Sequence, residues 1–86
     1  MTTTADPRSA LVRLAAALDP RDHSTTLTNG PGRPPRLTVA SRHAQLAEDI
    51  YADGDSYFWS WAERLGPVGD PAAAARKITT VLRAAP

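Results

Sequence analysis

The stretch that decides the fold is Leu46–Trp61, which has the sequence LAEDIYADGDSYFWSW. Asp53-Gly54 in its middle is a dipeptide that two-residue hairpin turns favour, and strand-forming residues flank it on both sides. The stretch therefore predicts a β-hairpin, with one strand at Leu46–Ala52 and the other at Asp55–Trp61.

Side chains alternate between the two faces of such a hairpin. With a turn at the Asp-Gly dipeptide, Ile50 lies opposite Tyr57. Aromatic rings then occur on both faces, so some of them are expected to remain exposed unless another chain covers them. One face carries Leu46, Ile50, Tyr57, Trp59 and Trp61, and the other carries Ala47, Asp49, Tyr51, Phe58 and Ser60.

The residues before the hairpin leave one alternative open. Short apolar runs are ambiguous between helix and strand. Ser41 has the side chain of a helix cap, and a short helix from Ser41 through Glu48 would shorten the first strand of the hairpin.

Two helices are predicted from the same start signal, an aspartate followed by a proline. The aspartate accepts from free backbone N–H groups, and the proline suits the first helical position. The first helix is expected over residues 7–18, before Pro20, and the second begins at Asp70-Pro71 and runs almost to the end of the sequence. Their apolar stripes are Leu11, Leu14 and Leu18 in the first helix, and Ala74, Ala75, Ile78, Val81 and Leu82 in the second.

The segment between the first helix and the hairpin predicts a loop followed by one strand. Residues 19–36 are rich in proline, glycine and arginine and predict a long loop, with room for a short strand at Thr25–Thr28. The run Arg36–Ala40 alternates, with Leu37 and Val39 on one face, and is expected to be the first strand.

These elements predict an α+β fold. An N-terminal helix, a three-stranded antiparallel β-meander with the Asp-Gly hairpin, and a C-terminal helix follow in order, with both helices on one face of the sheet. Residues 1–86 are expected to form a single small domain, in which residues 1–5 are a disordered N-terminus.

Composition excludes several classes of site. The chain of 86 residues contains no cysteine, which removes disulfides, thiolate catalysis and cysteine-based metal sites. Its histidines, His23 and His43, lack the motif of a catalytic or metal site, and the acidic residues Asp49, Asp53 and Asp55 lack the glutamate of a calcium loop. We therefore expect no enzyme activity, no cofactor and no metal. No apolar run is long enough to span a membrane, so a cytoplasmic protein without a membrane partner is expected.

The net charge of +1 hides an uneven distribution. Four arginines against one aspartate give residues 21–46 a charge of +3, and six carboxylates against one arginine give residues 47–70 a charge of −5. Such a chain can complement a second copy of itself or a charged protein. The charge pattern therefore favours a homodimer or another protein partner.

The loop Asn29–Arg36 resembles a phosphate-binding loop only superficially. It lacks the Lys-Ser/Thr ending and the following helix, and its prolines have no N–H group to offer. Its arginines, together with Arg42, would suit a nucleic-acid backbone if the aromatic side chains stacked on bases. Because the aromatic strand lies in the acidic segment, which repels phosphate, nucleic-acid binding is the weaker alternative.

The C-terminal half of the chain resembles a group of small proteins. Tyr57–Pro67, with the sequence YFWSWAERLGP, precedes Asp70–Ala74 and then Ile78 and Val81-Leu82. This order is similar to that of small uncharacterised actinobacterial proteins in which a Trp-x-Trp-Gly-like strand precedes a proline and an Ala-Ala helix. Several of them are encoded near helix-turn-helix regulators. Ala62 stands where those proteins have glycine. The resemblance implies a motif with a structural role, no active site, and a regulatory or accessory function.

Together these patterns predict a non-enzymatic protein–protein interaction module that acts on a transcriptional regulator or a biosynthetic enzyme. Small secretion-type chaperones have a similar α+β plan. The alternative is a single-stranded nucleic-acid-binding module that uses the arginine-rich loop and the aromatic strand. The residues expected to form the interaction surface are Tyr51, Tyr57, Phe58, Trp59, Trp61, Arg33, Arg36 and Arg42.

Overall fold

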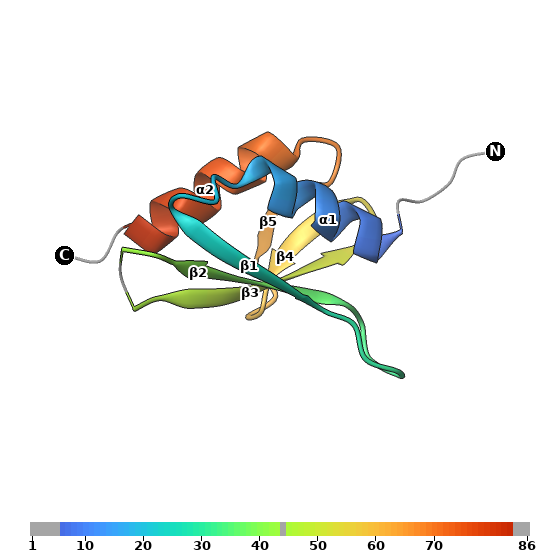
Figure 1. The fold of residues 1–86 in the computed structure, drawn as a ribbon. Coiled ribbons are helices and arrows are strands. Elements are labelled where there is room, and N and C mark those ends of the chain that lie inside the picture. Colours follow the sequence, from blue (N-terminus) through green and yellow to red (C-terminus); the bar gives the residue numbers. More distant parts are fainter. Residues whose placement is uncertain (1–5, 44, 84–86) are drawn as a thin grey trace.

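One antiparallel sheet with two helices on the same face makes up the fold (Figure 1). The computed structural model describes residues 6–43 and 45–83, so the N-terminal residues 1–5 that were predicted to be disordered lie outside the described residues. The strands lie side by side in the order in which they follow along the chain. The elements are α1 (Pro7–Ala17), β1 (His23–Thr28), β2 (Arg36–Ser41), β3 (Ala47–Asp53), β4 (Ser56–Trp59), β5 (Arg64–Pro67) and α2 (Pro71–Arg83).

The α+β prediction is confirmed, but the predicted number of strands is wrong, because the sheet has five strands rather than three. One of the two additional strands is β1, which lies within the predicted loop and contains Thr25–Thr28, the segment for which a short strand had been left open. Leu27 is the only apolar residue of β1, so no apolar alternation marks this segment in the sequence. The strand forms because β2 pairs with it along its whole length, from His23 opposite Ser41 to Thr28 opposite Arg36.

The other additional strand is β5, which has only four residues and contains a glycine and a proline. These residues disfavour strands, and Pro67 is tolerated because β5 lies at the edge of the sheet. The register with β4 shifts between Tyr57 and Phe58, so that Tyr57 lies opposite Gly66 and Phe58 opposite Arg64. The residue between them, Leu65, is buried.

The predicted hairpin is present, but its turn is one residue later than expected. Asp53 pairs with Ser56, which places Gly54 and Asp55 at the centre of the turn. Gly54 has a φ of +62°, and Asp55 does not have a positive φ. A positive φ at the first central position alone is the pattern of a type II′ turn, whereas a central Asp53-Gly54 would have given type I′.

The later turn shifts the strand register by two residues. Ile50 lies opposite Trp59 rather than Tyr57. Because side chains alternate with a period of two, the predicted division of β3 and β4 side chains between the two faces is unchanged. The alternative of a helix from Ser41 through Glu48 is wrong, because Ser41 ends β2 and Glu48 lies within β3.

Both helices begin at the predicted Asp-Pro signals. The Asp6 carboxylate accepts from the Ser9 N–H at 3.2 Å, and Asp70 accepts from the Ala73 N–H at 3.1 Å, so each aspartate caps a helix. The first helix ends at Ala17, one residue before the predicted end. Neither of these helices is long and apolar enough to cross a membrane.

The core lies between the two helices and the face of the sheet that they cover (Figure 1). Tyr57 lies at its centre with no exposed surface, and its hydroxyl donates to the backbone oxygen of Ala10 at 2.6 Å. This bond satisfies the one polar atom of the ring and links β4 to α1. The apolar residues of the core are Ala10, Leu11, Leu14, Leu18, Leu37, Val39, Ile50, Tyr57, Trp59, Leu65, Val68, Ala74, Ala75, Ile78 and Leu82.

We predict that Gly54→Val destabilises the protein by about 1–2 kcal/mol, because a β-branched residue disfavours the positive φ of the turn. A Cβ at this position would meet no atom within 4 Å, so the loss would reflect backbone conformation alone. Urea denaturation measures the change. Gly69→Val is the matched control, because Gly69 also has open space and does not have a positive φ. Equal losses for the two variants would contradict the proposed turn type.

We predict that Tyr57→Phe costs about 1 kcal/mol of stability at neutral pH, the value of one hydrogen bond. Burial raises the pKa of the Tyr57 phenol above its usual value of 10.0, so ionisation opposes folding. The contribution of Tyr57 is therefore present below pH 10 and declines as the pH rises above it. Urea denaturation across this range should show the difference between the wild type and Tyr57→Phe shrinking. Tyr51→Phe is the control, and an identical pH profile for both variants would contradict this account.

Candidate functional site on the uncovered sheet face

The face of the sheet that the helices do not cover carries a row of arginine and aromatic side chains. Tyr51 on β3 pairs with Phe58 on β4, and Phe58 pairs with Arg64 on β5. On the other side of Tyr51 lies β2, in which Leu37 pairs with Ile50 of β3. Because the two strands are antiparallel, the preceding residue of β2, Arg36, lies level with Tyr51. Thr28 pairs with Arg36 and completes the row. The register thus brings an aromatic pair between two arginines on one face.

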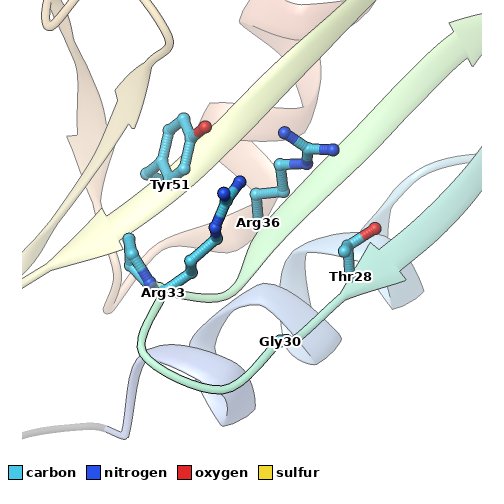
Figure 2. Close-up of a pocket in the computed structure, with 6 residues that line it drawn as sticks. Thr28, Gly30, Arg33, Arg36 and Tyr51 are labelled. Carbon is cyan, nitrogen blue, oxygen red and sulfur yellow. The ribbon is translucent and has the colours of Figure 1, made fainter.

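A hollow of about 170 Å³ lies at the β1–β2 end of this row. Figure 2 shows the guanidinium of Arg33 lying between the Tyr51 ring and Arg36, with the Thr28 hydroxyl on the strand beyond. The β1–β2 loop, which extends past the end of the sheet in Figure 1, contributes Gly30, Arg33 and Pro34 to the lining. The hollow is lined by Thr28, Gly30, Arg33, Pro34, Arg36 and Tyr51.

The arginines of the hollow are weakly paired within the protein. The guanidinium of Arg36 lies 4.0 Å from the Asp49 carboxylate, the limit of an ion pair. Asp49 already accepts a hydrogen bond of 2.6 Å from the Thr38 hydroxyl. Among the residues that the structure describes, no carboxylate lies within 4 Å of the Arg33 guanidinium. Both arginines are therefore available to a ligand.

A shallow groove of about 530 Å³ adjoins the hollow and shares Tyr51 and Pro34 with it. Its surface is mainly apolar, and among the residues that the structure describes Asp53 is the only charged one in its lining. The two features together offer an anion-binding corner beside an apolar surface. The groove is lined by Pro7, Pro34, Tyr51, Ala52, Asp53, Phe58, Trp59, Ser60 and Ala62.

Of the residues expected at the interaction surface, Tyr57 and Arg42 lie elsewhere, and Trp59 lines the groove but is almost entirely buried. Tyr57 and Trp59 face the helices and are buried, because their alternate positions on β4 place them on the core side. Arg42 follows β2 at the opposite end from Arg36, where its side chain donates to the backbone oxygen of Pro20 at 2.7 Å. Arg42 is thus separated from the arginines of the hollow, because the length of β2 lies between them.

Trp61 covers Trp59 rather than standing free. The two rings stack with centroids 4.9 Å apart and planes 6° from parallel. Trp59 is buried as a result, while Trp61 remains 51% exposed. Trp61 therefore closes the edge of the core with one ring face and presents the other to solvent.

The turn that holds Trp61 contains a strained residue. The Ala62 N–H donates to the Trp59 oxygen at 2.9 Å, and the Trp59 N–H donates to the Glu63 oxygen at 3.0 Å. Ala62 has a φ of +71°, and it is the only residue other than glycine with a positive φ in the described part of the chain. Glycine adopts this conformation without strain.

The histidines lie in two separate places. His23 is buried, its Nε2 lies 3.1 Å from the Thr79 hydroxyl, and its Nδ1 has no hydrogen-bond partner in the described part of the chain. His43 is exposed, and its Nε2 lies 3.0 Å from an Asp22 carboxylate oxygen. Within residues 6–43 and 45–83, no group of three metal-ligating side chains comes together.

Sequence reasoning missed two residues of the row, Thr28 and Arg64. Thr28 lies in the short strand that the sequence left open within the loop, and Arg64 lies on β5, which the sequence did not predict. Only the pairing of these strands places the two residues beside Arg36 and Phe58. Arg64 is held by a hydrogen bond of 2.9 Å from its Nε to the Ser56 hydroxyl. The charge and spacing of Arg64 in the sequence give no signal of this position.

Comparison with protein-family models, with curated proteins and with solved structures finds no match to this chain.

We predict that Ala62→Gly stabilises the protein by about 0.5–1 kcal/mol, because relief of the positive φ exceeds the greater chain entropy of glycine in the unfolded state. Thermal and urea denaturation measure the gain. Ala52→Gly, in β3 where no positive φ is required, is the control and should destabilise. A loss of stability in both variants would show that Ala62 is not strained.

Proposed function

We propose that this protein is a non-enzymatic protein–protein interaction module that binds a partner protein on the uncovered face of its sheet. The observation that carries the proposal is the Tyr51–Phe58 pair, which lies between Arg36 and Arg64 where no helix covers it. Aromatic residues and arginine are enriched in protein interfaces and contribute much of their binding energy.

The chemistry of the face favours binding over catalysis. Its arginines, hydroxyls and aromatic rings can hold a group, but a reaction needs a positioned base or nucleophile as well. His23 is buried against Thr79, and His43 is paired with Asp22 beyond the end of β2, so neither faces the hollow. This arrangement supports a role without an enzyme activity, a cofactor or a metal.

The partner that we propose is a transcriptional regulator or a biosynthetic enzyme in the cytoplasm of an actinobacterium, with this chain as a regulatory or accessory protein. The support for it is the resemblance carried by the Trp-x-Trp strand and the Ala-Ala helix. A homodimer through the same aromatic face is the second form of the proposal, and a chaperone-like role fits the α+β plan. Tyr51 and Phe58 would be covered in each case.

Single-stranded nucleic acid is the alternative partner. Arg33 and Arg36 beside Tyr51 and Phe58 supply the charge and the ring that stacking on a strand requires. Against this, Asp49 and Asp53 belong to β3 and share the face with Tyr51, and they would repel successive phosphates. We therefore rank nucleic acid below a protein partner.

The test compares two double variants in affinity isolation from the native host, followed by mass spectrometry and a binding assay with the purified partner. Tyr51→Ala with Phe58→Ala removes the aromatic pair. Val12→Ala with Val81→Ala is the matched control, because these side chains are apolar and exposed on the helices. We expect the first variant to bind about tenfold more weakly or worse, and the control to bind like the wild type.

Salt dependence separates the two kinds of partner. Docking that rests mainly on aromatic side chains should weaken only modestly as salt rises, whereas nucleic-acid affinity, which rests on many phosphate contacts, falls steeply. Tight, salt-sensitive binding to a single-stranded oligonucleotide that is lost in Arg33→Ala with Arg36→Ala would reverse the ranking. Equal binding of the partner by the wild type and by the aromatic double variant would contradict the proposed surface.

A further inference from the structure

The polar groups of the hollow beside Tyr51 are suited to an anion. Arg33 and Arg36 each carry a guanidinium, which donates hydrogen bonds and accepts none. The hydroxyls of Tyr51 and Thr28 can donate as well. Among the described residues, no carboxylate side chain lines the hollow. A planar fork of donors matches the oxygens of carboxylate and phosphate groups, so an oxyanion is the ligand that these groups recognise best.

The hollow can accept an anion without losing a strong internal contact. Arg33 has no carboxylate within 4 Å among the described residues, and the contact between Arg36 and Asp49 is 4.0 Å long. The loop that carries Arg33 is restrained by a hydrogen bond of 3.3 Å from the Arg33 N–H to the Gly30 oxygen. Pro31, Pro34 and Pro35 reduce its freedom further. Binding therefore costs less conformational entropy than it would in a flexible loop.

The surroundings of the hollow limit the ligand to a single charged group. Asp49 lies beside Arg36, and Asp53 lines the adjoining groove. A chain of phosphates would place further negative charges near these carboxylates. A ligand segment with a single anionic group and otherwise apolar side chains avoids this repulsion. The side chain next to its anion can then occupy the groove beside Tyr51 and Phe58.

We propose that the hollow binds one carboxylate or phosphate group of a protein partner, and that an apolar or aromatic side chain next to this group lies in the adjoining groove. The inference rests on the proposed function, because it specifies the chemistry that the partner presents. The partner segment thus carries an acidic or phosphorylated side chain beside an apolar one.

Small probes test the site without knowledge of the partner. Phenylacetate and phenyl phosphate carry a ring beside an anion, and phenylacetamide is the uncharged control. Proton–nitrogen correlation spectra of the full chain, including the arginine Nε–Hε signals, follow binding. We expect saturable shifts at Arg33 and Arg36 with the two anions, with a Kd on the order of 1 mM, and no saturable shift with phenylacetamide. Tighter binding of phenyl phosphate indicates a phosphorylated side chain, and equal or tighter binding of phenylacetate an acidic one.

Three variants of exposed arginines make the test specific. Arg33→Gln should weaken both anions by about tenfold, because it removes a charge-assisted pair of hydrogen bonds. Arg33→Lys should restore part of the affinity, because the charge returns without the fork. Arg76→Gln on α2 removes the same charge at a distant, exposed position and should leave binding unchanged.

Several outcomes would overturn the proposal. These are saturable binding of phenylacetamide with the same affinity, shifts that persist in Arg33→Gln, or shifts that Arg76→Gln reduces as much. An oligonucleotide that binds through Arg33 more tightly than phenyl phosphate would also overturn it, in favour of nucleic acid. If the affinity isolation succeeds and the probes do not bind, this inference alone is wrong. If the probes bind as expected and Tyr51 and Phe58 prove irrelevant to the partner, the anion site stands, but the proposed docking face and the groove part of this inference are wrong.

Discussion

The alternation of side chains along β3 and β4 ties the core of this protein to its uncovered face. Successive residues of a strand point to opposite sides, so burying Ile50 and Tyr57 beneath the helices places Tyr51 and Phe58 on the other side. A shift of one residue would exchange the two sets and leave the core side with the polar groups of the open face. The core and the candidate site are thus two results of the same strand pairing.

On the open face, charged side chains limit the size of the exposed apolar surface. Arg36 and Arg64 flank the aromatic pair in the same row, so the rings do not join into a wide apolar patch of the kind that promotes aggregation. On the covered face, Tyr57 reaches the backbone of α1 and Trp61 closes over Trp59. These contacts leave one face of the sheet free while the other is sealed.

Local signals in the sequence predicted the helices, the hairpin and the division of its side chains between two faces. Asp6 and Asp70 each cap a helix by accepting a hydrogen bond from a backbone N–H three residues later. This contact is local and does not depend on the rest of the fold. The strand at His23–Thr28 has no such signal, because its threonines become part of a sheet only when β2 pairs with them. The turn was predicted one residue too early. A glycine with positive φ fits the second central position of a type I′ turn and also the first central position of a type II′ turn, so Gly54 alone does not distinguish them. Arg33, Arg36, Tyr51 and Phe58 were expected at the interaction surface, but their grouping, and the absence of Arg42 from it, depend on the pairing of strands.

The contact between α1 and α2 has a consequence for how the chain acquires its structure in the cell. These helices are the first and the last elements described, and α2 also packs on β5. The core therefore cannot close until α2 has been made and has packed on both α1 and β5. Until then Leu65 and its neighbours on β5 lack the cover that α2 provides. The nascent sheet must therefore avoid other chains until translation of α2 is complete, and the helix layer closes only after that.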